Sequence, residues 1–274
     1  MMYGIKSVLK YLLGTDIADR NLAVYSDDTF VVSYPRSGNT WTRFLIANLA
    51  FSSEAVSFVN IERMFPDTSS QSNRALKRTR RPRIIKSHQY FDPRYPKVLY
   101  LVRDPRDVVL SYYNFQRKYR QIADHYPLAD YVDDFVNCRL ISADWGSWGE
   151  NVASWVYPRQ NQSGFLLMRY EDIKDNTLQQ LQEIVTFLGL EPTPERLKQA
   201  IEASSSERMR AMERTQSDHW IATKKHRKDI PFVGAATSGQ WRSNLPEHLV
   251  SKIEATWGNL MLTLGYSLVT TEVS

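Results

Sequence analysis

Residues 30–49, FVVSYPRSGNTWTRFLIANL, combine a strand pattern, a short polar turn and an amphipathic helix in which apolar residues recur at spacings of three and four. The turn carries Arg36 and Gly38, with hydroxyl groups at Ser37 and Thr40. Backbone N–H groups and the positive end of the helix converge at such a junction, and a guanidinium grips an anion with a planar fork. The stretch predicts a binding turn for a phosphate or sulfate group; the alternative is an ordinary βα loop with a helix cap.

Strand and helix patterns alternate along the rest of the chain. Strands are expected at residues 30–34, 83–86, 97–102 and 165–170, and helices at 40–50, 105–122, 127–140, 146–160, 176–188, 194–203 and 246–264. This alternation predicts an α/β fold: a central parallel sheet flanked by helices on both faces, in a P-loop-like nucleotide-binding architecture. At 274 residues, one domain over residues 1–274 is expected.

Three segments stand outside this pattern. Residues 1–25 predict an N-terminal helical extension whose apolar run is too short for a signal peptide or a membrane span, although its docking on a membrane surface stays open. Residues 53–82 and 205–240 are polar and irregular, and we expect them to form acceptor-site or lid loops over the carboxyl ends of the strands. With a single cysteine, Cys138, the chain is expected to be cytoplasmic.

The charge balance favours anionic partners without naming one. The net charge is +5 and the isoelectric point is near 9.2. The densest basic run, from Arg74 to Lys86, fits a polyanion or a solvated loop, but it has few aromatic residues and so gives no support for nucleic-acid binding. The five histidines lack metal-ligand spacing, so no metal is expected.

Two more strand ends carry chemically active side chains. Arg103 follows the strand KVLYLV, and Ser111 lies two helical turns further on; together they suit a second anionic group, unless Arg103 pairs with a nearby carboxylate. His88 ends the strand that contains Lys86. A histidine there suits a general base with Lys86 neutralising developing charge, and the alternative is a structural histidine.

Five motifs, in order, show a resemblance to one family. They are YPRSGNTW (34–41), IIKSHQY (84–90), VLYLVRDPRDVVLSYYNF (98–115), GSWGENVASW (146–155) and FLLMRYEDIKDN (165–176). The chain resembles the soluble, cytosolic sulfotransferases that use 3′-phosphoadenosine 5′-phosphosulfate (PAPS). The resemblance implies in-line transfer of a sulfuryl group to a hydroxyl or phenol of a small molecule, with release of adenosine 3′,5′-bisphosphate (PAP) and no metal.

The resemblance also assigns residues to roles. It implies that His88 is the base and that Lys86 and Arg36 assist transfer. The phosphosulfate loop would comprise Arg36, Ser37, Gly38, Asn39, Thr40 and Trp41, with Arg103 and Ser111 at the 3′-phosphate, Tyr170 beside the adenine and Ser204 near the nucleoside.

The chain departs from the family pattern in three places. Ser206 stands where the family often has an aromatic residue that stacks on the adenine. Arg36 stands where the family usually has lysine, which keeps the charge but removes a proton donor. The family segment R-K-G-x-x-G-x-W is matched only at its end, by SGQW (238–241). Either Arg227 and Lys228, upstream, or the backbone of residues 234–236 is expected to complete the 3′-phosphate site.

Two other functions are open to a basic chain of this pattern. A P-loop-type nucleotide-dependent kinase would need a Lys-Ser or Lys-Thr pair after the glycine, and that pair is absent. A non-enzymatic polyanion-binding protein would use the 74–86 run. The sequence leaves the acceptor and the oligomeric state open.

Overall fold

The computed structural model describes residues 13, 16–18, 21–51, 54–142, 144–220, 222–234 and 237–270. The helix expected within residues 1–25 falls largely outside the described residues. Among those described, no helix is long and apolar enough to cross a membrane.

Four parallel strands form one sheet. They are β1 (Thr29–Ser33), β2 (Ile84–Ser87), β3 (Lys97–Val102) and β4 (Phe165–Arg169), in the order β2-β1-β3-β4. The strand that follows β1 pairs on one side of it and the next pairs on the other, so the carboxyl end of β1 is a topological switch point, where open α/β sheets bind ligands. The predicted fold class is confirmed, and each strand lies within a residue of its expected position.

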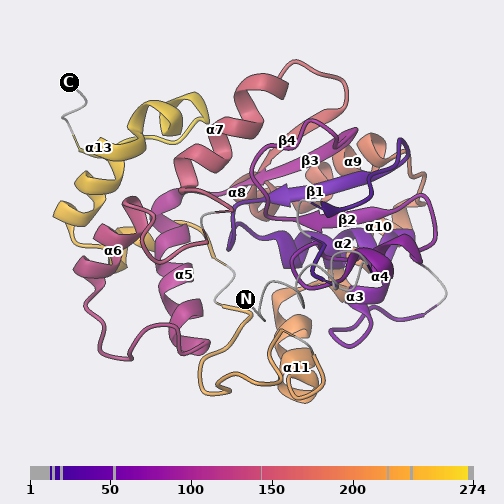
Figure 1. Ribbon diagram of the computed structural model, residues 1–274, viewed down its shortest axis with the longest axis horizontal. Coiled ribbons are helices and arrows are strands. Elements are labelled where there is room, and N and C mark those ends of the chain that lie inside the picture. Colours follow the sequence, from indigo (N-terminus) through magenta and orange to yellow (C-terminus); the bar gives the residue numbers. More distant parts are fainter. Residues whose placement is uncertain are drawn as a thin grey trace.

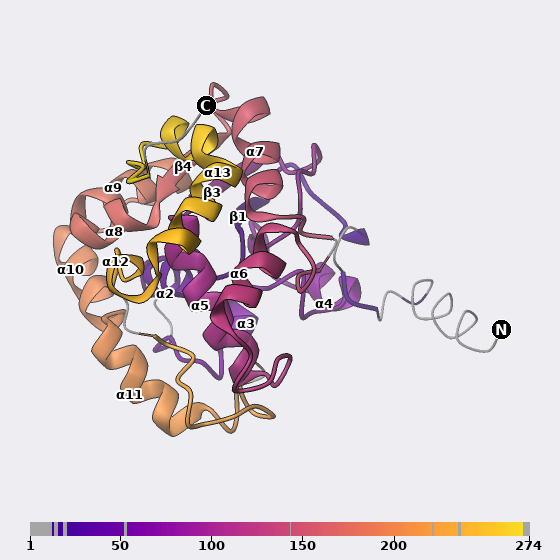
Figure 2. The ribbon, with the colours of Figure 1, turned by 90° about the vertical axis from the view of Figure 1, so that its left-hand side faces the viewer.

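Seven helices match the expected ones and cover both faces of the sheet (Figures 1 and 2). They are α2 (Asn39–Ala50), α5 (Pro105–Lys118), α6 (Leu128–Val136), α7 (Trp148–Arg159), α9 (Thr177–Leu188), α10 (Pro194–Ala203) and α13 (Glu247–Thr263). Shorter helices are α3 (Ile61–Met64), α4 (Asn73–Lys77), α8 (Tyr170–Asp175) and α12 (Trp241–Asn244).

Alternation of buried side chains along the strands produces two cores. On one face Phe30 and Tyr100 pack with α5, α6, α7 and α13; on the other, Val31 and Leu99 pack with α2, α9 and α10. Side chains of a strand point alternately to opposite faces, so a sheet covered on both sides needs apolar residues at nearly every position. In Figure 1, α5, α6 and α13 accordingly lie together, apart from α2, α9 and α10.

The helix boundaries follow local capping chemistry. The Asp104 side chain accepts a hydrogen bond from the N–H of Arg106, with Pro105 at the first helical position of α5. Thr193 caps α10 in the same way, and Gly189 ends α9 in the left-handed conformation.

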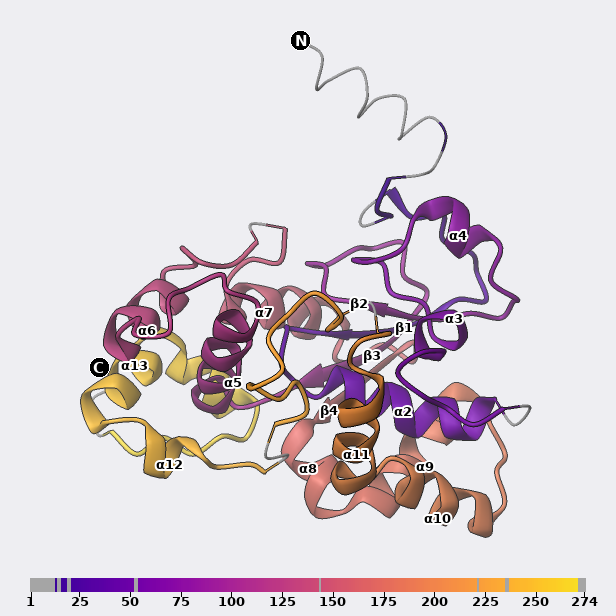
Figure 3. The ribbon, with the colours of Figure 1, turned by 90° about the horizontal axis from the view of Figure 1, so that it is seen from below.

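We expected the segment 205–240 to be irregular throughout. The structure differs, because the segment contains the helix α11 (Ser206–Gln216). Ser205 caps this helix, but within it only Met209 and Glu213 are buried, so the apolar stripe is too thin to show as periodicity. After α11 the chain runs past the end of α5, as Figure 3 shows. The segment 53–82 likewise contains the short helices α3 and α4.

Candidate active site

The turn between β1 and α2 has the geometry of an anion-binding turn. Arg36 and Gly38 adopt left-handed backbone angles, with φ of 69° and 91°. Gly38 is the N-cap of α2, no side chain caps that end, and the first turn holds no acidic residue. The Ser37 hydroxyl is buried and has no hydrogen-bond partner among the described residues. Unpaired N–H groups, the helix dipole and this hydroxyl all suit an anion.

The aromatic rings of Tyr170 and Trp41 pack beside this turn. A Cβ atom at Gly38 would overlap the ring of Tyr170, reaching its Cε2 at 2.9 Å. Tyr170 and Trp41 meet edge to face, with ring centroids 5.9 Å apart. The Trp41 indole N–H donates to the Ser204 carbonyl at 3.0 Å, and the Ser204 hydroxyl accepts from Asn48 at 3.1 Å. Ser204 therefore holds Trp41 in place and has its own hydroxyl engaged.

Asn39 joins the turn to the strand. Its side-chain amide donates to the Val31 carbonyl and to the Ser33 hydroxyl, both at 3.2 Å. The side chain is buried, which directs it into the protein. Thr40, the next residue of α2, is half-buried.

The Arg36 guanidinium crosses from the turn to α5. Its Nε donates to the Ser111 hydroxyl at 3.1 Å and an Nη donates to the Phe232 carbonyl at 3.2 Å. The rings of Phe115 and Phe232 flank it at 5.0 and 4.8 Å. Burial lowers the pKa of Arg36 to about 10, so the group stays charged at neutral pH.

Arg103 lies at the same place from the other side. It donates to the Arg36 carbonyl at 3.2 Å and to the Thr237 carbonyl at 3.1 Å, and its guanidinium carbon is 4.5 Å from the Tyr170 ring centroid. The nearest carboxylate, Asp107, is 3.9 Å away, and the Arg103 Nε is buried without a partner among the described residues. The structure thus brings Arg36, Ser111, Arg103 and Tyr170 together.

His88 is held in one tautomer. Its Nδ1 lies 2.7 Å from the Ser33 carbonyl oxygen, which can only accept, so Nδ1 carries the proton and Nε2 keeps a free lone pair. Trp145 packs against the ring at 5.7 Å. Burial, together with the positive charge of Lys86, lowers the His88 pKa to about 3 and keeps the imidazole neutral.

Lys86 does not present a free positive charge. Its ammonium donates to Asp67 at 2.6 Å, and both side chains are nearly buried. Lys86 lies on β2, two residues before His88, and Asp67 reaches it from the preceding segment. Lys86 therefore affects the transfer site as half of an ion pair.

Arg227 and Lys228 lie far from Arg103, contrary to the expectation that they complete a 3′-phosphate site. The Arg227 N–H donates to the carbonyl of Lys118 at the last turn of α5, a helix about 21 Å long, whereas Arg103 precedes its first turn. Arg227 is paired with Asp124 and Asp229. Lys228 is paired with Asp218 at 3.0 Å. Of the alternative, residues 234–236, only Gly234 is described.

Two site residues were missed from the sequence. Asp107 accepts hydrogen bonds from the backbone N–H groups of Gly239 at 2.6 Å and Trp241 at 3.1 Å, which fixes the SGQW turn beside Arg103. Asn151 donates to the carbonyls of His88 and Trp145, at 3.2 and 2.7 Å. The signal that could have found Asp107 was the SGQW match, which lacks the Arg-Lys pair that the family pattern places before it.

These features define a nucleotide-binding α/β enzyme with a neutral histidine beside an anion-binding turn. The family model described as "Sulfotransferase domain" matches residues 26–265, and the chain belongs to this family. Rat Sulfotransferase 1E1 is 28% identical over 243 residues, which are 83% of this chain and 81% of that protein. Human Sulfotransferase 2A1 is 27% identical over 232 residues, 81% of this chain and 79% of that protein.

Solved structures share the fold. Mouse sulfotransferase SULT7A1, complexed with PAP, gives a TM-score of 0.71 at 21% identity and covers 88% of this chain and 87% of that one. Retinol dehydratase in complex with retinol and PAP gives a TM-score of 0.71 at 20% identity, covering 92% and 85%. The chain is a PAPS-dependent sulfotransferase. Among the described residues no cluster of three or more His, Cys, Asp or Glu is placed to hold a metal ion.

Proposed function

We propose that this enzyme transfers the sulfuryl group of PAPS to a hydroxyl of a small-molecule acceptor, with His88 as general base. The observation that carries the proposal is the 2.7 Å contact of His88 Nδ1 with the Ser33 carbonyl, which leaves Nε2 unprotonated at the end of the strand beside the anion-binding turn. The solved relatives support the small-molecule acceptor, since retinol dehydratase has been crystallised with retinol and with androsterone.

The residues present fit the nucleotide. The unpaired Ser37 hydroxyl and the uncapped first turn of α2 suit the 5′-phosphosulfate, while Arg103, with its unpartnered Nε, and Ser111 suit the 3′-phosphate. Trp41 and Tyr170 offer rings to the adenine. When bound, PAPS supplies the sulfuryl group and a phosphate leaving group.

The transfer step balances without a further reactant. The acceptor oxygen forms a bond to sulfur as the bond between sulfur and the 5′-phosphate oxygen breaks, and His88 Nε2 takes the hydroxyl proton. Arg36 stabilises the negative charge that collects on the leaving phosphate; because a guanidinium keeps its proton, this contribution is electrostatic. The SGQW turn and Tyr170 hold the nucleotide in register.

The low pKa of free His88 fits this role once the nucleotide is bound. In the free protein, burial and Lys86 oppose protonation, giving a pKa of about 3. A bound nucleotide brings several negative charges close to the ring, and these favour the imidazolium form. The imidazole is therefore a stronger base when the donor is bound than in the empty site.

Two measurements test the proposal. PAP should raise the thermal midpoint of the protein, whereas ATP with magnesium and oligonucleotides should not. His88→Ala should keep PAP affinity and lose at least a hundredfold in transfer to alcohols and phenols from labelled PAPS. Arg103→Ala should show the opposite pattern: its main effect should be a loss of PAP affinity. Full activity of His88→Ala removes the histidine from the mechanism, and absence of PAP binding removes the proposed site.

A further inference from the structure

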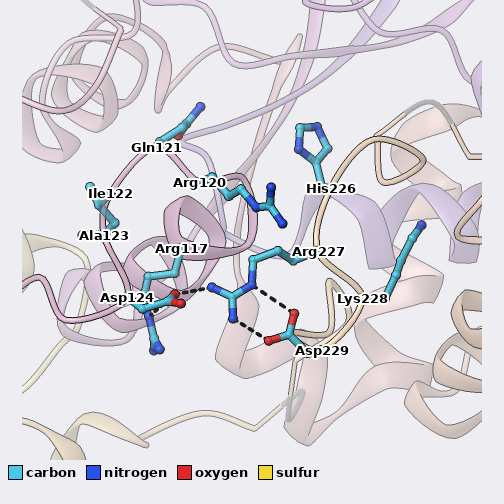
Figure 4. Close-up of a pocket in the computed structure, with 10 residues that line it drawn as sticks. All are labelled: Arg117, Arg120, Gln121, Ile122, Ala123, Asp124, His226, Arg227, Lys228 and Asp229. Atoms are coloured by element: carbon cyan, nitrogen blue, oxygen red, sulfur yellow. Dashed lines mark hydrogen bonds and ion pairs between the residues drawn. The ribbon is translucent and has the colours of Figure 1, made fainter.

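A basic pocket opens at the carboxyl end of α5, about 900 Å³ in volume (Figure 4). We call it the α5 pocket. Four cationic side chains and two carboxylates line it, together with Gln121, Ile122, Ala123 and His226; the charged residues are Arg117, Arg120, Arg227, Lys228, Asp124 and Asp229. The lining therefore carries an excess of positive charge.

The pocket's carboxylates are already engaged, and two of its arginines keep donors to spare. Asp124 and Asp229 both pair with Arg227. Arg117 reaches Asp124 only at 3.8 Å, and its Nε is buried without a hydrogen-bond partner. The Arg120 guanidinium has no hydrogen bond or ion pair with any described residue and points toward His226 and Arg227 in Figure 4. Free guanidinium donors in a concave site suit an anion.

The positive charges around the pocket act on His226, which lines it. The His226 pKa is lowered by burial and by the charges of Lys118, Lys228 and Lys225. An anion entering the pocket would meet these charges together with those of Arg117 and Arg120.

A row of rings connects the α5 pocket to the transfer site. Phe115 stacks on Tyr119 with centroids 4.0 Å apart, and Tyr119 stacks on His226 at 3.8 Å. Phe115 also flanks Arg36. All three rings are half-buried, so they keep some exposed apolar surface. Along α5, Ser111 and the last residue, Lys118, are separated by about 10 Å, and Arg120 follows two residues later.

We propose that the acceptor is an alcohol or phenol with an apolar body and an anionic group at its far end, which the α5 pocket binds through Arg120 and Arg117. The proposal rests on the proposed sulfotransferase function and deepens it. The hydroxyl lies at His88 and the body runs along Phe115 and Tyr119. The site for the acceptor's anionic group is separate from the proposed site for the nucleotide 3′-phosphate, because Arg103 and Ser111 lie toward the other end of α5.

The test uses the protein saturated with PAP and two probes that differ only in charge, ω-hydroxydodecanoate and its methyl ester. Calorimetry should show the carboxylate binding the wild-type protein at least tenfold more tightly than the ester. Arg120→Ala should abolish this preference without changing ester or PAP affinity, and Arg120→Lys should restore part of it. Arg80→Ala is the matched control, since it removes an exposed arginine from the other basic run.

Each outcome decides the matter. Equal affinity for the two probes, no binding of the carboxylate, or a preference that survives Arg120→Ala overturns the proposal while the sulfotransferase function stands. If Arg80→Ala also lost the preference for the carboxylate, that preference would reflect general attraction by a basic protein, and the proposal would be overturned. Failure of PAP to bind in the first titration counts against the proposed function instead, so the two are distinguished.

Discussion

At the scale of single residues, Gly38 matters because of what lies against it. Its φ of 91° is unfavourable for other residues, and a Cβ would run into Tyr170. We predict that Gly38→Ala lowers PAP affinity at least tenfold, because the turn and the ring must move apart. Isothermal calorimetry measures this. Gly189→Ala is the matched control: its φ of 74° is also left-handed, but its Cβ would have nothing within 4 Å, and unchanged PAP affinity is expected there.

Besides burial, which lowers the His88 pKa most, two neighbours act on it in opposite directions, and each can be removed separately. Lys86 lowers this pKa and Asp67 raises it. We predict that Lys86→Met raises the His88 pKa above its value of about 3, since a like charge is lost, and that Asp67→Asn lowers it. NMR titration of the imidazole reports both shifts. Shifts of the same sign in the two variants would contradict the assigned electrostatics.

At the scale of elements, the first turn of α5 organises one side of the proposed nucleotide site. Asp107 holds Gly239 and Trp241 by their N–H groups, and Thr237 meets Arg103 in the same segment. We predict that Asp107→Ala weakens PAP binding about tenfold or more with a smaller effect on kcat, because it frees this segment but leaves His88 untouched. Nucleotide titration and steady-state kinetics separate the two effects.

A second variant distinguishes a positioning role of Asp107 from an effect on folding. Asp107→Asn keeps one acceptor oxygen and should lose less affinity than Asp107→Ala. Circular dichroism on both variants should show the same folded signal before PAP is added. Equal losses in the two variants, or loss of fold in both, would argue against a positioning role.

The elements themselves were largely predictable, because each was specified locally. Asp104-Pro105 begins α5 and Gly189 ends α9, so their boundaries could be read from neighbouring residues. The helix α11 was missed because only Met209 and Glu213 of it are buried. Arg36, Arg103 and Ser111 were expected at one nucleotide site; hydrogen bonds join them in the structure, and their binding role stays a prediction.

Contacts between segments that are distant in the chain could not be predicted from the sequence. The hydrogen bonds of Asp107 with Gly239 and of Arg103 with Thr237 join parts of the chain more than 130 residues apart, and no local pattern records them. The same limit misplaced Arg227, which lies upstream of the SGQW turn in sequence yet packs at Lys118. Loop paths of this kind depend on tertiary packing.

At the scale of the whole molecule, a buried ion-pair network ties α13 to α5. Arg106 pairs with Asp104 at 2.7 Å and with Glu254 at 2.5 Å, and Glu254 also accepts the N–H groups of Val269 and Thr270. We predict that Glu254→Ala lowers the free energy of unfolding by about 3–5 kcal/mol, because it leaves Arg106 buried and short of a partner. Urea denaturation measures the loss.

The comparison for this prediction is an ion pair on the surface. Glu202 pairs with Arg208 where both side chains are more than half exposed. Glu202→Ala should change the free energy of unfolding by less than about 1 kcal/mol. Similar losses in the two variants would show that the Arg106 network is not the source of the effect.

The long-range contact between Asp107 and Gly239 also bears on how the enzyme matures. The ribosome releases the turn at Arg36 and the start of α5 long before the SGQW turn that Asp107 anchors. A nascent chain arrested ahead of Gly239 would therefore lack one wall of its nucleotide pocket, however well its sheet had formed. Complete binding of the nucleotide is therefore expected only after residues 239–241 have been synthesised and have reached Asp107.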